Sequence, residues 1–183
     1  MTSIHLDRSN GSSRKPTAFG LNVFLACPIT QLLDPQHHEL PSDYEHFIRA
    51  IYQFLRLRAD RVFLALDREG WGKAVMPPEV CTPLDFAEMQ RCSLLVAYPG
   101  RSMGVSIELG WAAALGKPMI LLLEPTAPPT PLIDGLSYLP GADVQRVTVG
   151  GSPCLATARG LEADLDHALS RFGTRRDNLA AAP

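Results

Sequence analysis

The amino-acid sequence predicts an α/β fold in which helices cover both faces of a five-stranded parallel sheet. Short, β-prone apolar runs alternate along the chain with segments whose apolar residues recur at helical spacing, and this alternation is typical of βαβ units. The runs carry apolar residues at consecutive positions, as strands do when both faces of a sheet are buried. The predicted architecture is therefore a single-domain, Rossmann-like or flavodoxin-like, three-layer fold.

Four apolar runs and the segment VQRVTV are the predicted strands. They lie at 21–27, 61–66, 93–98, 117–123 and 144–149. Pro28 ends the first run, and a long loop with two glycines and two prolines, at 67–81, follows the second. Loops of this length inside a compact domain are usually functional.

The predicted helices are recognised from their spacing and their end signals. The first follows a cap at Ser42 or Asp43 and carries Phe47, Ile51, Phe54 and Leu55 at helical spacing. A short helical turn is expected at 131–137, and an amphipathic helix at 156–172.

Two further helices flank the third strand. Thr82 is the predicted N-cap of a helix at 83–91 that has proline at its first position. The next helix is predicted at 104–115 and stops at Gly116, because glycine adopts the left-handed conformation that commonly ends a helix.

Length and composition fit one globular domain. The chain is 46% hydrophobic and 20% charged, with a formal net charge of −2, so no nucleic-acid partner is expected. We expect the domain at 19–173, between a disordered N-terminal tail at 1–18 and a flexible C-terminal tail at 174–183. The N-terminal tail lacks the apolar centre of a secretion signal, and no run approaches the roughly 20 apolar residues of a spanning helix. No membrane partner is therefore expected.

The cysteines and histidines give no sign of a metal site. The four cysteines form no CxxC pair, which favours reduced thiols and a cytoplasmic location. His37 and His38 are adjacent and point apart in an extended chain, and the other histidines are scattered. We expect neither a metal nor another cofactor.

Three loops are predicted to meet where chemistry can occur. Ligands of parallel sheets bind at the carboxyl ends of the strands, and the loops leaving that edge are 28–34, 67–81 and 98–104. We expect the functional site at their junction.

The segment YPGRSMGVSIELGWA at 98–112 is the most informative. Gly100, Ser102 and Gly104 lie in the turn before a predicted helix, where free amides and a hydroxyl favour an anion. Glu108 lies about one turn into that helix, and the helix dipole there favours the ionised carboxylate that a nucleophile requires. The alternative is that Glu108 is only a favourable acid near a helix N-terminus.

The string SMGVSIELG at 102–110 resembles the nucleoside 2-deoxyribosyltransferase superfamily. It is most similar to the branch that hydrolyses nucleoside monophosphates, in particular the CMP and hydroxymethyl-CMP hydrolases of peptidyl-nucleoside antibiotic pathways. The other segments that carry this resemblance are FLACPITQLLDP at 24–35, REGWG at 68–72, LDFAEM at 84–89, AYPG at 97–100 and ELGWAAALGKPMILLLE at 108–124.

The resemblance implies roles for five residues. Glu108 would attack the anomeric carbon and form a glycosyl-enzyme ester, and Asp85 matches the second acid, which contacts sugar or base and shuttles a proton. From its predicted place in a first helical turn, the alternative for Asp85 is a capping carboxylate. Ser102, Gly104 and Val105 match the phosphate-binding turn, which favours a 5′-phosphorylated substrate.

Five more residues are candidates for the base and sugar. Phe24 matches an aromatic position that stacks near the base, or it is simply a core residue. Ile29 and Thr30 depart from the Phe-Arg pair that the hydroxymethyl-CMP hydrolases carry, so CMP, dCMP or another base is favoured over hydroxymethyl-CMP. Glu69 and Trp71 would shape the base side of the pocket, and Trp71 is alternatively a loop anchor.

The predicted function is that of an N-glycosidase that hydrolyses the base–sugar bond of a nucleoside 5′-monophosphate. Two alternatives stay open: a transferase that exchanges bases on deoxyribose, and a non-catalytic module that senses a nucleotide. The resemblance also implies a homodimer or larger homo-oligomer with shared active sites.

Overall fold

The computed structural model describes residues 20–37, 39–127 and 129–180, and it has the predicted three-layer α/β architecture. The strand order is β2-β1-β3-β4-β5, and every neighbouring pair is parallel. The N-terminal tail predicted at 1–18 lies outside the described residues. Within them, no helix is both long and apolar enough to cross a bilayer.

All five predicted strands are present, with shorter bounds. They are β1 (Asn22–Ala26), β2 (Arg61–Phe63), β3 (Leu94–Ala97), β4 (Met119–Leu123) and β5 (Val144–Thr148). The prediction of a strand at 61–66 is wrong in its second half. β2 is an edge strand that pairs only with β1, and after Phe63 the chain turns into a helix whose amides at Asp67 and Arg68 donate to the Leu64 carbonyl.

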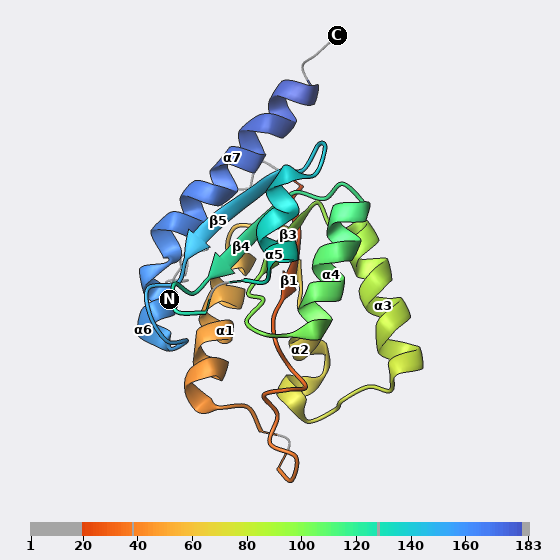
Figure 1. Cartoon of the computed structure of the whole chain (residues 1–183), viewed down its shortest axis with the longest axis vertical. Helices are drawn as coiled ribbons and strands as arrows, with labels where there is room; N and C mark the ends of the chain where they lie inside the picture. Colours follow the sequence, from red (N-terminus) through yellow and green to blue (C-terminus); the bar gives the residue numbers. More distant parts are fainter. Residues whose placement is uncertain (1–19, 38, 128, 181–183) are drawn as a thin grey trace, which may run out of the picture.

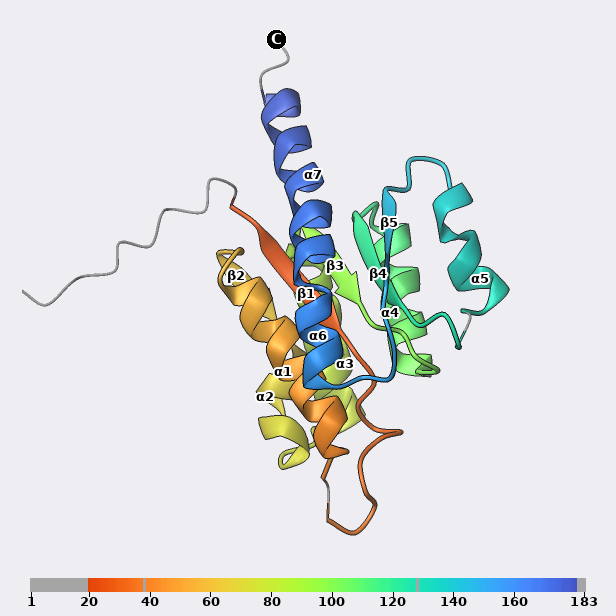
Figure 2. The same ribbon diagram turned by 90° about the vertical axis from the view of Figure 1, so that its left-hand side faces the viewer.

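Helices cover the sheet on both faces, as Figures 1 and 2 show. Their bounds are α1 (Ser42–Arg56), α2 (Ala65–Arg68), η1 (Gly70–Gly72), α3 (Pro78–Arg91), α4 (Met103–Ala114), α5 (Pro131–Asp134), η2 (Gly135–Tyr138), α6 (Leu155–Gly160) and α7 (Glu162–Ala180). Helices α1, α6 and α7 lie on one face and face the viewer in Figure 2, whereas α3 and α4 lie on the other.

Several helix ends differ from the prediction. Pro41, and not Ser42 or Asp43, is the N-cap of α1. The helix expected at 156–172 is two helices that divide at Leu161, and α7 continues to Ala180. The C-terminal tail assigned to 174–183 therefore begins inside α7, and its last three residues lie outside the described part of the chain.

Helix α3 begins at Pro78, not at Pro83 as expected. Pro77 is its N-cap, so the chain enters the helix through two prolines that need no N–H partner there. Pro83 lies inside the helix and leaves one intrahelical hydrogen bond unmade. Thr82 is consequently not a cap, and Asp85 lies in the second turn rather than the first.

The core has two halves because successive strand residues point to opposite faces. Val23 and Leu25 of β1 pack with α1, α6 and α7, whereas Phe24 and Ala26 pack with α3 and α4. Buried residues on α4, chiefly Val105 and Leu109, fix that helix on the sheet. The packing therefore sets the position of every side chain that α4 presents at the carboxyl edge.

Candidate active site

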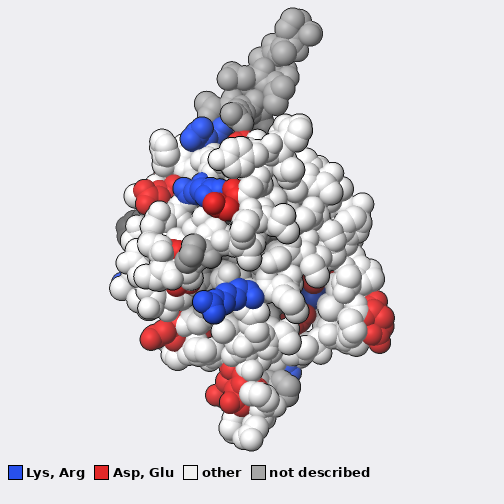
Figure 3. Space-filling view, viewed as in Figure 1, with Lys and Arg blue, Asp and Glu red and all other residues white. Residues whose placement is uncertain are grey.

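A cavity of about 510 Å³ opens at the carboxyl edge of the sheet, where the loops after β1, β2 and β3 meet. The three loops that the sequence placed at this edge all contribute to its wall, so their predicted convergence is confirmed. Figure 3 shows a hollow, right of centre, in which acidic and basic atoms lie together. The lining residues are Cys27, Ile29, Thr30, Gln31, Ala65, Glu69, Cys81, Thr82, Asp85, Ser102, Met103, Gly104, Val105, Ile107, Glu108 and Trp111.

The start of α4 forms one end of the cavity. Ser102 is the N-cap, and its Oγ accepts a hydrogen bond from the Val105 amide at 3.3 Å. The amides of Met103 and Gly104 belong to the first turn, where no preceding helical carbonyl is available to accept from them. A Cβ added at Gly104 would meet only Ser102 Oγ, at 3.7 Å, so the space beside this amide is open. The arrangement favours an anion in the cavity.

Glu108 is half-buried on α4 and lines the same cavity. Burial raises the pKa of its carboxyl to about 8; the charge of Asp85 adds to the rise, and Arg68 opposes it. The expectation that the helix dipole keeps Glu108 ionised is therefore corrected, because desolvation and a neighbouring carboxylate outweigh the dipole. At neutral pH the raised pKa favours the protonated form of this carboxyl in the free protein.

Asp85 approaches Glu108 from α3. Its Oδ1 accepts a hydrogen bond from Arg68 Nη1 at 2.6 Å. Burial raises its pKa, Arg68 lowers it, and the charge of Glu69 raises it further. Since Asp85 lies well inside the helix, its capping alternative is removed.

Arg68, which the sequence did not single out, links two of the acids. Besides Asp85, its guanidinium bonds Oε1 of Glu69 through Nη2 at 2.9 Å. Glu69 is buried and lines the cavity. Nothing in the described part of the chain groups three or more His, Cys, Asp or Glu side chains in a metal-binding arrangement. The cavity wall thus contains three carboxyl groups, two of which bond one cation that lies behind the wall.

Solved structures share this fold and this length. The solution structure of BlsM has a TM-score of 0.69 and 34% sequence identity, and the match covers 91% of this chain and 99% of BlsM. The chain belongs to the nucleoside 2-deoxyribosyltransferase-like superfamily. A CMP N-glycosidase from Clostridium botulinum, BcmB, has a TM-score of 0.51 and 28% identity, covering 79% of this chain and 98% of BcmB. No family model matches the sequence, and neither does any curated protein.

Most of the residues that the superfamily resemblance singles out come together in the cavity. Glu108, Asp85 and Glu69 supply the acids, and Ile29 and Thr30 lie on the wall that follows β1. The phosphate-binding candidates, Ser102, Gly104 and Val105, form its α4 end.

Phe24 does not reach the cavity. Its side chain is fully buried beneath the sheet and packs on the ring of Phe63, with the ring centroids 4.9 Å apart. The base-stacking role is corrected to a core role, because alternation along β1 turns this residue toward α3 and α4.

Trp71 is also outside the cavity wall. Its backbone adopts a left-handed conformation with φ of 62°, and its Nε1 donates to Asp67 Oδ1 at 3.2 Å. The guanidinium of Arg49 on α1 lies 3.5 Å from the ring centroid. These contacts make Trp71 an anchor of the loop against α1 rather than a wall of the base pocket.

Trp111 supplies an aromatic side chain that the site-residue prediction omitted. It lines the cavity one turn after Glu108, and its ring meets Phe86 edge-on with the centroids 5.2 Å apart. Its spacing of three residues from Glu108 is the sequence signal that places both on one face of α4.

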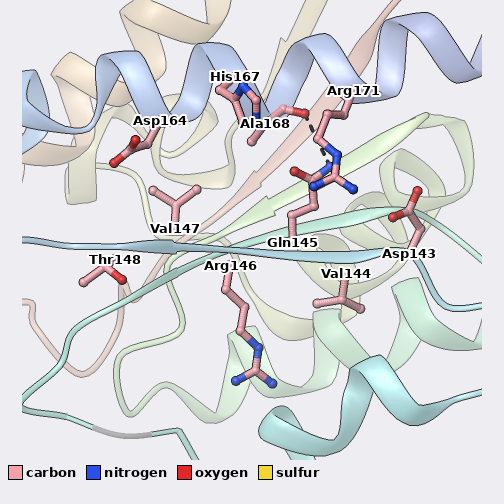
Figure 4. Close-up of a pocket in the computed structure, with 10 residues that line it drawn as sticks. All are labelled: Asp143, Val144, Gln145, Arg146, Val147, Thr148, Asp164, His167, Ala168 and Arg171. Atoms are coloured by element: carbon pink, nitrogen blue, oxygen red, sulfur yellow. Dashed lines mark hydrogen bonds between the residues drawn. The ribbon is translucent and has the colours of Figure 1, made fainter.

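A second cavity, of about 570 Å³, lies along β5 and α7 (Figure 4). Asp143 and Asp164 lie near its opposite ends in this view. The side chain of Arg146 points away from α7, and its Nη1 donates to Asp134 at 2.5 Å. Gln145 Nε2 donates to the Ala168 carbonyl at 3.5 Å. This cavity, called the β5–α7 cavity below, therefore contains no converging pair of acids.

Proposed function

We propose that this protein is an enzyme, a nucleoside 5′-monophosphate N-glycosidase that hydrolyses the base–sugar bond of CMP or another pyrimidine monophosphate. The observation that carries the proposal is the presence of Glu108 and Asp85 in one cavity that ends at the start of α4. The likeness to BcmB, a CMP N-glycosidase, supports the class of reaction.

Glu108 is the nucleophile in a double displacement. Its proton first passes to Asp85. The ionised Glu108 oxygen then bonds to C1′ while the C1′–N bond breaks, and the base leaves with the electron pair and takes the proton from Asp85. Water then attacks C1′ of the glycosyl ester, the ester bond breaks, and the water proton passes to a carboxylate. The products are free base and ribose or deoxyribose 5-phosphate, and Asp85 is the group that relays the proton.

The electrostatics of the cavity suit a cationic transition state. In the free protein the ionised form of Glu108 is disfavoured by burial and by Asp85, which is why its pKa is raised to about 8. An oxocarbenium-like sugar brings positive charge next to these acids, and the carboxylate then stabilises it more strongly than it stabilises neutral substrate. Interactions that strengthen only in the transition state are those that raise kcat.

The α4 end of the cavity holds the 5′-phosphate. The Met103 and Gly104 amides and the Ser102 hydroxyl are hydrogen-bond donors on the same face, and the N-terminus of a helix favours a dianion. The phosphate contacts would fix the sugar so that C1′ lies against Glu108.

The protein functions as a homodimer or larger homo-oligomer whose subunits share active sites. Support comes from α4, where Met103 is 81% exposed and Ile107 is 54% exposed. Gly110 and Ala114, which are also exposed, follow Met103 and Ile107 at heptad spacing, so the four residues form one exposed stripe along α4. Because Met103 and Ile107 also line the cavity, a second copy packed on this stripe would cover the cavity mouth.

The test is base release from a panel of nucleoside 5′-monophosphates, with the matching nucleosides as controls. We expect one pyrimidine monophosphate, CMP or dCMP, to be cleaved fastest and the unphosphorylated nucleoside to be cleaved poorly. Glu108→Ala should lower kcat by at least about 10³-fold, because nucleophile and charge stabilisation are lost together. Near-wild-type activity in this variant would refute the mechanism.

Two outcomes would favour the other functions. Formation of a new nucleoside or nucleotide when a foreign base is added indicates a transferase, because base then competes with water for the same ester. Tight binding of a monophosphate with no turnover across the panel indicates a sensing module.

A further inference from the structure

Arg68 reaches the candidate active site from behind its wall. It lines a separate hollow of about 320 Å³, together with Leu84 and Glu88, while its two terminal nitrogens bond Asp85 and Glu69. Both of those carboxylates do line the Glu108 cavity. One guanidinium therefore holds two wall residues without itself forming part of the wall.

The remaining donor of this guanidinium is left unpaired. Arg68 Nε is buried and has no hydrogen-bond partner among the described residues. A buried donor without a partner is destabilising, so the side chain is placed for its two carboxylates and not for its own hydrogen bonding. The unpaired Nε therefore indicates that Arg68 has a role other than packing.

We propose that Arg68 is a positioning residue that fixes Asp85 and Glu69 in the cavity wall and supplies the counter-charge that allows Asp85 and Glu108 to be ionised together. The effect of Arg68 on catalysis rests on the proposed function. The effect of Arg68 on the ionisation of Asp85 and Glu108 is independent of it.

The charged groups around Glu108 come from three directions. Asp85 faces it from α3, Arg68 and Glu69 face it from the segment after β2, and the Cys27 thiol faces it from the end of β1. Burial raises the pKa of the Cys27 thiol to about 12, so the thiol stays neutral. Arg68 is consequently the cation that offsets the carboxylates.

Asp85 has one more acidic neighbour. The charge of Glu88, one turn later on α3, raises the pKa of Asp85. Glu88 is itself paired with Arg61 Nη1 at 2.5 Å and Arg91 Nη1 at 3.1 Å. Glu88 is partly buried and the two arginines are exposed, so this cluster provides an arginine–carboxylate pair on the same helix but outside the Glu108 cavity.

Because Asp85 and Glu108 interact, the pair loses its two protons in two steps with separate apparent pKa values. The step at higher pH, called the upper step below, leaves both carboxyl groups negative. Arg68 stabilises that doubly ionised state because it is the nearest positive charge. Removing the guanidinium must raise the upper apparent pKa, whichever carboxyl holds the last proton. This direction holds even though loss of Arg68 also alters the balance between Asp85 and Glu108.

The experiment is a ¹³C NMR titration of the Asp and Glu carboxyl carbons in the full chain, without substrate. In the wild type we expect an upper step near pH 8 at Glu108. In Arg68→Met it should move up by about one pH unit or more. Arg61→Met, which breaks one of the two pairs of Glu88, is the control and should move the upper step much less than Arg68→Met, because Arg91 still pairs with Glu88.

Arg68→Lys separates charge from geometry. Lysine keeps the positive charge but lacks the planar fork that bonds two carboxylates at once. We expect its upper pKa to stay near the wild-type value, while kcat for the best monophosphate falls about tenfold with little change in KM. The pH at which kcat/KM reaches half its plateau should follow the NMR value in each variant.

An unchanged upper step in folded Arg68→Met would overturn the counter-charge role, and an unchanged kcat in Arg68→Lys would overturn the positioning role. Should the methionine variant not fold, Glu69→Gln provides the second electrostatic measurement. It removes an acid that raises the pKa of Asp85 and should lower the upper step, and no movement there would count against the proposal. If the protein turns over no monophosphate, the NMR titrations still decide the electrostatic part.

Discussion

The Glu108 cavity and the β5–α7 cavity have similar volumes, about 510 and 570 Å³, but different chemistry. In the first, half-buried or buried acids from separate elements meet around Arg68. In the second, Asp143 and Asp164 lie at opposite ends, and Arg146 turns away to bond Asp134. Convergence and desolvation of ionisable groups, and not volume, distinguish a candidate active site from a groove.

Topology explains the difference between the two cavities. The Glu108 cavity lies at the carboxyl edge between β1 and β3, where connections leave to opposite sides and loops from three strands meet. The β5–α7 cavity lies along an edge strand, so one strand and one helix supply its walls. Fewer elements bring fewer side chains to a common point.

Substituting one acid in each cavity tests the difference between them, and the largest loss of activity is expected at Asp85. Asp85→Asn keeps the shape but removes the proposed proton relay, so kcat/KM for the best monophosphate should fall by at least about 10²-fold. Asp164→Asn makes the same change in the β5–α7 cavity and should leave kcat/KM within about twofold of wild type. Steady-state base release measures both, and equal losses in the two variants would show that the comparison is mistaken.

A smaller effect is expected at the α4 end of the cavity. In Gly104→Ala the new methyl meets only Ser102 Oγ at 3.7 Å, so the protein should fold, but the methyl occupies the space beside the amide that is proposed to bind the phosphate. KM for the monophosphate should rise about tenfold or more, with little change in the slow cleavage of the nucleoside.

Gly160→Ala is the matched control for that variant. It is the last residue of α6, away from α4, and it is exposed at a point where a Cβ meets no atom within 4 Å. Because alanine favours a helix over glycine by up to about 1 kcal/mol, this variant should fold with at least the wild-type thermal stability and keep the wild-type KM. A KM that rises equally in both variants would remove the argument that the phosphate lies at Gly104.

The smallest effect is on stability and depends on pH. The pKa of Glu108 is about 8 in the folded protein, against about 4.5 for an unperturbed glutamate, which represents the unfolded chain, so the folded state binds its proton more tightly. This binding stabilises the fold fully at low pH, relative to the ionised side chain, and the stabilisation is lost as pH rises through about 8. Glu108→Gln does not ionise, so its Tm should exceed that of the wild type by at least about 3 °C at pH 9 and by little at pH 5.

Calorimetry at the two pH values tests this, with Asp164→Asn as the reference from the other cavity. A Tm difference that is the same at pH 5 and pH 9 would show that ionisation of Glu108 does not oppose folding.

The five strands and the location of the site follow from the sequence because they rest on strong local signals, whereas the sequence does not predict the order of the strands. Consecutive apolar residues mark the first four strands. Gly116, which has a positive φ, marks the end of α4 as predicted, and the predicted start at 104 is one residue late. The carboxyl-edge rule then places Glu108 at the junction of the three loops without any knowledge of contacts.

The errors occur where local signals are ambiguous or absent. A strand that is apolar on both faces does not reveal which side Phe24 faces, and a Thr-Pro pair indicates a helix start even when, as at Thr82 and Pro83, the helix has already begun. The hydrogen bond between Arg68 and Asp85 joins residues 17 apart in the sequence, and neither periodicity nor a motif predicts it. The raised pKa of Glu108 follows from burial, which the sequence does not report.

A close contact between the backbone at Gly100 and Pro28 fixes the distance between the two ends of the Glu108 cavity. Gly100 has a φ of +49°, and a Cβ on it would come within 3.2 Å of Pro28 Cγ, so the exits of β1 and β3 rest directly on each other. The segment that carries Ile29 and Thr30 is thereby held at a set span from the turn that carries Ser102. If the proposed function is right, this fixed distance suits a monophosphate, and the longer nucleoside diphosphate should be cleaved more slowly.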